Sequence, residues 1–249
     1  MGKNRGRQLH LSKEHQILRD VKSRRQKFKK ILSVLQDYHP NPQFLNCLDI
    51  GCSSGIITTL LGEHCPMVIG MDIDRGALYD AKEHSPPWVQ FFIADAMALP
   101  FKENSIHVIV CNHIYEHVPQ AEGLMDEIYR VLSAEGFCYF SAGNKYVVIE
   151  GHYHLPFLSW IPKPLAHLYL RLAGKGDFYY EEHLSLRGLK RLVRRFRVHD
   201  YTLSIIRHPE KFHATDLFGR KTFLRKCMVW FAPCFYRWFP TYIWVLTKK

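Results

Sequence analysis

Short apolar runs alternate with longer amphipathic stretches through the middle of the chain. The apolar runs fall at Cys47–Ile50, Met67–Met71, Gln90–Ala94, Ile106–Cys111 and Phe137–Ser141. Stretches with apolar positions at helical spacing lie between them, at Ile56–Glu63, Gly76–Glu83 and Ala121–Leu132. Strands that alternate with helices in this way are typical of a parallel sheet covered by helices. The pattern therefore predicts an α/β fold.

Two stretches of the chain interrupt this alternation. Residues 142–183 are rich in aromatic residues and proline, and a second interruption covers residues 207–239. Outside these interruptions, the pattern predicts one more helix and two more strands, at Ser185–Phe196, Val198–Ile205 and Tyr242–Leu246. We therefore expect residues 41–249 to form one α/β domain with two insertions, of which the first is a helical and aromatic cap.

Both ends of the chain are basic, whereas its middle is mildly acidic, and the formal net charge is +11. Residues 1–40 are predicted to carry a basic N-terminal helix, because apolar positions recur at helical spacing. Cys227–Thr247 is an apolar segment of almost membrane-spanning length, interrupted by one arginine and two prolines. A helix in this segment suits a membrane interface or the protein core. The basic ends suit an anionic membrane, a phospholipid-like substrate or nucleic acid, and equally a solvated surface.

The seven cysteines show no C-x-x-C spacing, and several fall inside apolar runs, where cysteine behaves as a small apolar residue. Residues 1–30 are basic and lack the apolar run of a signal peptide. We therefore expect a cytoplasmic protein, with peripheral contact to an anionic membrane as an open alternative.

A glycine turn follows the first predicted strand and opens a helix. Gly51 and Gly55 belong to this turn, where glycine lets the backbone approach a ligand and take a positive φ. The second strand ends in Asp72, about 20 residues after the turn, which is where a Rossmann-type acid binds ribose hydroxyls. The turn does not match G-x-G-x-x-G, so a nicotinamide enzyme is disfavoured.

Two further motifs follow in order along the chain. Ala94–Phe101 closes the third strand, and Tyr115-Glu116-His117-Val118 follows the fourth. Glu127–Leu132 and then Gly136 precede the fifth. With the glycine turn and Asp72, these motifs resemble the class I S-adenosylmethionine-dependent methyltransferases, nearest the type-11 group, over about residues 45–140. The resemblance implies a Rossmann-like, mostly parallel seven-stranded sheet with helices on both faces.

The same resemblance implies four residues around the methionine part of S-adenosylmethionine. Gly51 and Gly55 would let the loop pass beneath it, and Asp49 would orient that loop and the cofactor's amino group. Asn112, just past the fourth strand, would face the methionine carboxylate or the substrate. Ser53 stands where the family often has glycine, which leaves this loop less room.

Four more residues would surround the nucleoside part of the cofactor. Asp72 would accept both ribose hydroxyls, and Ile73 would pack against the adenine. Asp95 would accept the adenine amino group, and the Ala96 N–H would face a ring nitrogen. Asp74, by contrast, is predicted to be a helix N-cap.

His113-Ile114-Tyr115-Glu116-His117 reads H-x-x-E-H, a zinc-protease pattern when it lies on a helix. Its place after a parallel strand argues against a protease, and imidazole suits Mg²⁺ poorly, so we predict no metal. Instead, His117 or His113 is expected to position the acceptor or take its proton. The alternative is that Glu116 and His117 only cap and pack the following helix.

The acceptor site is expected to come from the cap, whose aromatic residues and histidines would cover an apolar acceptor. Its predicted substrate-binding residues are His152, His154, Trp160 and Tyr179. We therefore expect a methyltransferase acting on oxygen or carbon of a small, apolar or lipid-like acceptor. An RNA methyltransferase and a non-catalytic binding protein of the same fold remain as alternatives, and nucleic acid is the less favoured partner.

Overall fold

The computed structural model describes residues 21–40, 46–215 and 232–249. The beginning of the predicted N-terminal helix therefore lies outside the described residues. So does the part of the apolar segment Cys227–Thr247 that precedes residue 232, together with its basic flank. Within the described ranges, every helix is too short or too polar to cross a bilayer.

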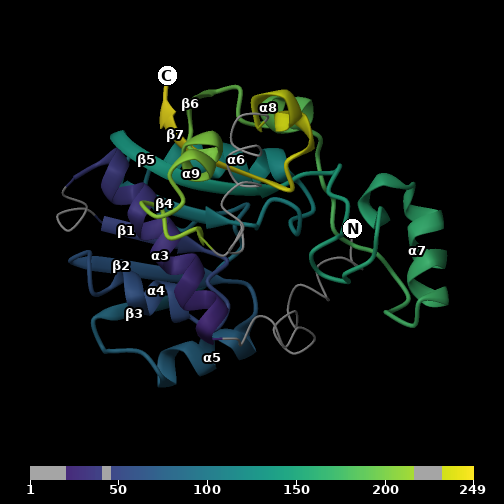
Figure 1. Cartoon of the computed structure of the whole chain (residues 1–249). Helices are drawn as coiled ribbons and strands as arrows, with labels where there is room; N and C mark the ends of the chain where they lie inside the picture. Colours follow the sequence, from purple (N-terminus) through teal and green to yellow (C-terminus); the bar gives the residue numbers. More distant parts are fainter. Residues whose placement is uncertain (1–20, 41–45, 216–231) are drawn as a thin grey trace.

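A seven-stranded sheet forms the centre of the fold, in the order β3-β2-β1-β4-β5-β7-β6 (Figure 1). The strands are β1 (Asn46–Ile50), β2 (Met67–Asp72), β3 (Val89–Ile93), β4 (Ile106–Asn112), β5 (Leu132–Gly143), β6 (Phe196–Asp200) and β7 (Thr241–Lys248). The first five pair in parallel, while β7 runs antiparallel to both β5 and β6. This confirms the predicted Rossmann-like sheet and its mostly parallel pairing.

Helices cover both faces of the sheet because each has one apolar stripe to bury. Side chains of α3 (Val21–Tyr38), α4 (Ile56–Leu61) and α9 (Thr202–Arg207) share one core layer with β1 and β5. Side chains of α6 (Ala121–Val131) and α8 (Leu186–Leu192) pack in the opposite layer. The described part of the N-terminal helix thus packs its apolar side chains against one face of the sheet. Helix α5 (Arg75–Glu83) contacts β2 and β3.

The predicted strand Val198–Ile205 is wrong in its second half. Strand β6 ends at Asp200, whose Oδ1 accepts the backbone N–H of Thr202 at 2.9 Å and so begins α9. Ile205 is then buried in the helical layer rather than in the sheet. The predicted helix Ser185–Phe196 is also too long, because α8 ends at Leu192 and Phe196 already begins β6.

The cap lies between β5 and α8 and extends to one side of the sheet (Figure 1). It contains the short helix η3 (Leu158–Trp160) and α7 (Lys163–Leu172), and it has a small apolar core of its own. Tyr115 joins the cap to the sheet, since its hydroxyl donates to the Gly143 carbonyl and accepts the backbone N–H of Leu184. The cap is therefore held over the carboxyl end of β4, next to which Tyr115 stands.

Candidate functional site

The predicted cofactor residues meet at one edge of the sheet. Strands β1 to β4 are parallel, so their carboxyl ends lie together, and ligands bind there in open α/β sheets. Gly51 follows β1, Asp72 ends β2, Asp95 follows β3 and Asn112 ends β4. The tertiary structure thus brings together residues that are far apart in the chain.

The loop after β1 needs glycine at two positions. Gly51 and Gly55 have φ values of 72° and 70°, which L side chains rarely adopt. A Cβ at Gly51 would lie 2.1 Å from Cδ1 of Ile114, and a Cβ at Gly55 would lie 2.7 Å from Cβ of Ala81. Ser53 also takes a positive φ, of 50°, and its buried hydroxyl has no hydrogen-bond partner among the described residues. The two glycines therefore let the loop pack closely against Ile114 and Ala81, and the Ser53 hydroxyl remains unused.

Asp72 holds the loop from the end of β2. Its two oxygens accept the backbone N–H groups of Ser53, at 2.7 Å, and Asp74, at 2.9 Å. Burial raises the pKa of Asp72, and these hydrogen bonds oppose the rise. Asp74 is the helix N-cap that the sequence predicts, accepting the Ala77 N–H at 3.1 Å. Because a carboxylate has about four acceptor positions, Asp72 keeps capacity for further donors.

Asp49 is buried inside the sheet edge rather than displayed on the loop. Its side chain is 4% exposed and accepts the Thr58 hydroxyl of α4 at 2.7 Å. Burial raises its pKa to about 7, while Thr58 and the charge of Arg24 act in the opposite direction. Arg24 of α3 lies within electrostatic reach of both Asp49 and Asp72. Burial lowers the pKa of Arg24, and the negative charges of the two aspartates oppose this change. A cation thus approaches the cofactor edge from a helix that sequence reasoning did not connect to it.

Asp95 shapes the turn after β3, where its Oδ1 accepts the Met97 N–H at 2.9 Å. The following backbone is fastened to α6. Arg130 donates to the carbonyls of Leu99 and Phe101 at 2.8 and 2.7 Å, and Glu127 accepts the Leu99 N–H. The remaining predicted cofactor residues, Ile73, Ala96 and Asn112, are all half-buried at the same edge.

The residues at this edge fit a ligand that combines an amino acid with a nucleoside. Asp72 and Asp95 supply acceptors for hydroxyl and amino groups at the ends of neighbouring strands. The Ser53 hydroxyl in the loop after β1 has no hydrogen-bond partner among the described residues, and Arg24 supplies a positive charge for a carboxylate. S-adenosylmethionine presents the matching groups, namely ribose hydroxyls, amino groups and a carboxylate.

The H-x-x-E-H segment lies in a turn, which begins where β4 ends, and not on a helix. His113 has a φ of 58° and is held at both ring nitrogens: Nδ1 lies 3.0 Å from Oε1 of Glu116, and Nε2 lies 3.1 Å from Oγ of Ser141. His117 instead meets the cap, with its ring edge-on to His152 at 4.8 Å between centroids. Burial lowers the pKa of His117 to about 4, so its imidazole is neutral at neutral pH.

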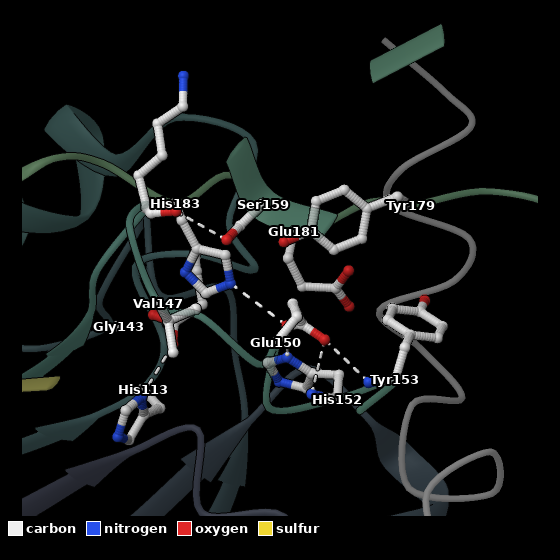
Figure 2. A network of polar contacts seen from close by, with 12 residues as sticks. His113, Gly143, Val147, Glu150, His152, Tyr153, Ser159, Tyr179, Glu181 and His183 are labelled. Carbon is white, nitrogen blue, oxygen red and sulfur yellow. Dashed lines mark hydrogen bonds and ion pairs between the residues drawn. The ribbon is translucent and has the colours of Figure 1, made fainter. Parts of the chain in front are cut away.

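A cluster of histidines and carboxylates stands where the cap meets this turn (Figure 2). Glu150 is its centre: Oε1 lies 2.7 Å from Nδ1 of His152 and 3.4 Å from Nε2 of His183. Burial alone would raise the pKa of Glu150, but hydrogen bonds to the two histidines and the charge of His152 hold it well below its usual range. Glu181 and Tyr179 line the same cluster, both buried.

Of the predicted substrate-binding residues, two join this cluster and two do not. His152 and Tyr179 do, whereas His154 is exposed. Trp160 donates to the Val147 carbonyl at 2.7 Å and stacks on Trp238, apart from the cluster.

Sequence reasoning missed Glu150 and Glu181. Their signal is a repeated pattern, because Glu150-x-His152 and Glu181-x-His183 occur once on each side of α7.

Comparison with known proteins supports a methyltransferase. Residues 48–140, from β1 into β5, match the family model of the methyltransferase domain. Over 103 residues the chain is 31% identical to the biotin biosynthesis bifunctional protein BioHC of Cellvibrio japonicus, an alignment that covers 41% of this chain and 20% of that protein. Over 94 residues it is 30% identical to the ubiquinone/menaquinone biosynthesis C-methyltransferase UbiE of Desulfotalea psychrophila, covering 36% and 38% of the two chains. The chain thus spans less than half the length of both relatives.

Solved structures share the fold over most of the chain. An S-adenosylmethionine-dependent methyltransferase from Mesorhizobium loti superposes with a TM-score of 0.57 at 16% identity, covering 86% of this chain and 95% of that one. The YcgJ protein from Bacillus subtilis superposes with a TM-score of 0.53 at 17% identity, covering 88% and 98%. The likeness in fold therefore extends well beyond residues 48–140, which the family model matches.

Proposed function

Because the chain carries a class I S-adenosylmethionine-dependent methyltransferase domain of the type-11 group, we propose that it transfers a methyl group to a small acceptor. The accepting atom is an oxygen or carbon of an apolar or lipid-like molecule. The observation that supports this proposal is the match of residues 48–140 to the methyltransferase domain, a range that includes Asp72 at the end of β2 and Asp95 just after β3.

The residues that would hold the cofactor are those of the sheet edge. Asp72 would accept the ribose hydroxyls, with Ile73 against the adenine, and Asp95 with the Ala96 N–H would bind the adenine edge. When bound, S-adenosylmethionine supplies an electrophilic methyl group on a sulfonium. Such a transfer needs alignment and exclusion of water more than it needs catalytic groups.

The loop after β1 would hold the methionine part. Gly51 and Gly55 would lie beneath it, with Asn112 opposite, and the carboxylate would pair with Arg24. Asp49 would then act through the loop, since its carboxylate accepts the hydroxyl of Thr58 on α4.

On the acceptor side, His117 is the better placed of the two predicted catalytic histidines. Both ring nitrogens of His113 have protein partners, so His113 positions the turn. His117 borders the cap through His152, where an acceptor held between the cap and β4 would meet it. Its proposed role is to position the acceptor and receive its proton.

The test is methyl transfer from labelled S-adenosylmethionine, followed by mass spectrometry, to three sets of acceptors: quinone precursors, long-chain acids or lipids, and RNA. The two curated relatives are named for quinone and biotin synthesis, so we expect labelled product from a small acceptor and none from RNA. The His117→Asn variant is expected to lower kcat while leaving affinity for S-adenosylmethionine unchanged. Methylation of RNA alone would establish the alternative, and cofactor binding without any product would favour a non-catalytic protein.

We further propose that the protein works in the cytoplasm at the surface of anionic membranes. Leu165, Leu168 and Leu172 are 56%, 46% and 79% exposed along α7, and the basic residues Arg171 and Lys175 accompany them. An amphipathic helix with apolar and basic positions binds anionic lipid interfaces.

This proposal predicts co-sedimentation with vesicles containing phosphatidylserine, weakened by salt. The Leu168→Asp variant should reduce the bound fraction severalfold, because it places a charge in the apolar stripe. Tyr79→Ser, which changes an exposed aromatic residue on α5, is the matched control and should bind as the wild type does. Equal binding by both variants would show that α7 is not the helix that contacts the lipid.

A further inference from the structure

Two Glu-x-His segments of the cap converge on one point (Figure 2). One, Glu150-x-His152, precedes α7, and the other, Glu181-x-His183, follows it. Oε1 of Glu150 lies 2.7 Å from Nδ1 of His152 and 3.4 Å from Nε2 of His183. The fold thus assembles two imidazoles and two carboxylates from opposite ends of the cap.

These side chains form two overlapping groups of possible metal ligands. Glu150, His152 and His183 make one group, and His117, His152 and Glu181 make the other. Within each group the ligand atoms lie within 4.8 Å of one another, and His152 belongs to both. Two imidazoles with one carboxylate is a donor set used for transition metals, with positions left open for other ligands.

A second, independent observation is an unused carboxylate oxygen in the same cluster. Glu181 is 2% exposed, and its Oε2 has no hydrogen-bond partner among the described residues. A buried carboxylate oxygen without a hydrogen-bond partner is costly, and the nearby Lys163 ammonium donates to the backbone carbonyl of Glu181 while lying within electrostatic reach of its carboxylate. Tyr179, next to it, likewise has a buried hydroxyl for which the described part of the chain offers no partner. The cluster therefore has more negative and polar capacity than its own hydrogen bonds use.

We propose that this cluster binds one divalent transition-metal ion, with Glu150, His152 and His183 as ligands and Glu181 beside them. Two imidazole nitrogens select Zn²⁺, Co²⁺, Fe²⁺ or Ni²⁺ over Mg²⁺ and Ca²⁺, which prefer oxygen. Bonds of about 2.0–2.2 Å to a tetrahedral ion place ligand atoms roughly 3.4 Å apart. The contact between Glu150 and His183 already has that length, and the contact between Glu150 and His152 needs to open by less than 1 Å.

The carboxylate of Glu150 is oriented for this role. Its other oxygen, Oε2, accepts the backbone N–H groups of His152 and Tyr153, both at 2.8 Å. These bonds leave Oε1 directed at the two imidazoles. Hydrogen bonds that fix a ligating carboxylate are a regular feature of metal sites, because they prevent the ligand from turning away.

The proposal departs from the sequence-based expectation that the protein has no metal. That expectation considered only H-x-x-E-H, whose His113 has Glu116 at one ring nitrogen and Ser141 at the other. The ligands proposed here come from the cap, and His117 joins them only at the border, through its edge-on contact with His152. An ion at this border would add a Lewis acid on the acceptor side of the proposed methyltransferase site.

Metal binding can be tested without any methyl-transfer assay, by titrating the metal-stripped full-length chain with Co²⁺ alone. We expect one equivalent to bind with the visible absorption of four- or five-coordinate Co²⁺, and stoichiometric Zn²⁺ to displace it. The thermal midpoint should rise by roughly 5 °C at saturating Zn²⁺. The spectrum should lack a thiolate-to-metal charge-transfer band. The presence of such a band would show that the ion is bound by cysteine instead.

Variants identify the ligands. His152→Ala removes the residue shared by both groups and should abolish the Co²⁺ spectrum, and the near-isosteric Glu150→Gln should weaken binding at least tenfold. His154→Ala, an exposed histidine of the same segment, is the matched control and should bind as the wild type does. Far-UV circular dichroism verifies that each variant is folded.

Absence of Co²⁺ binding by the wild type would overturn the proposal, as would full binding by folded His152→Ala or Glu150→Gln. Because neither S-adenosylmethionine nor an acceptor is present, these outcomes do not depend on the proposed methyltransferase reaction. Conversely, the ion could bind as described while no acceptor is methylated. That result would support the metal site and contradict the proposed methyltransferase function.

Discussion

The Asp72→Ala variant is expected to bind S-adenosylmethionine about 100-fold more weakly than the wild type. In its proposed role, Asp72 accepts two ribose hydroxyls, and hydrogen bonds to a charged group contribute about 1.5 kcal/mol or more each. Two of them correspond to about 3 kcal/mol, which is about two orders of magnitude in affinity. Isothermal titration with S-adenosylmethionine and S-adenosylhomocysteine measures the loss.

Asp72 also accepts the backbone N–H groups of Ser53 and Asp74, so its removal loosens the loop. The Asp72→Asn variant separates the two effects in part, because its amide keeps one accepting oxygen and a similar shape. We expect intermediate affinity for Asp72→Asn and wild-type affinity for Glu83→Gln, an exposed acid on α5. If folded Asp72→Ala binds within threefold of the wild type, the cofactor does not lie at the end of β2.

The Asp49→Asn variant is expected to be more stable than the wild type at pH 8, by an amount that disappears in acid. Asp49 is buried, and burial raises its pKa from 3.8 to about 7. A shift of this size corresponds to about 4 kcal/mol between the two protonation states. Asparagine keeps an oxygen that can accept the Thr58 hydroxyl and never carries the buried charge.

The direction follows from proton binding in the two states. Between pH 4 and pH 7 the folded protein keeps the proton on Asp49, whereas the unfolded chain has lost it. Wild-type stability therefore falls as the pH rises through this range, and the loss is complete above the folded pKa of about 7. The advantage of Asp49→Asn should grow over the same interval and then remain constant.

Urea unfolding of both proteins at pH 5, 6, 7 and 8 measures this difference. The control is Asp80→Asn, which changes an exposed aspartate on α5 and should shift stability by less than about 0.5 kcal/mol at every pH. A stability difference between Asp49→Asn and the wild type that does not change with pH would show that Asp49 is ionised throughout, with Arg24 or another cation compensating its charge.

The sheet and its cofactor edge could be predicted from the sequence because both depend on local patterns. A buried parallel strand is a short apolar run, and each run predicted from Cys47 to Ser141 became a strand with bounds that differ by a few residues. Parallel strands place their carboxyl ends at one edge of the sheet. A parallel α/β fold therefore brings Gly51, Asp72 and Asp95 to the same edge. The predicted boundary after β6 is wrong because Tyr201 and Thr202 favour strands by propensity. The Asp200 side chain, which accepts the Thr202 N–H, and the hydrogen bonds of both residues to Ile243 of β7 instead turn the chain into α9.

The amino-acid sequence by itself thus determined the sheet, the glycine turn and the row of acids at the strand ends, since each arises from neighbours in the chain. Tertiary structure alone decided that Arg24 reaches the cofactor edge, that His113 is held by Glu116 and Ser141, and that the two Glu-x-His segments meet. Most of these contacts join residues that are far apart in the sequence. The geometry of the contacts depends on how α3 and the cap pack against the sheet. No periodicity along the chain carries that information, because the packing of one element against another is set by the shapes of both.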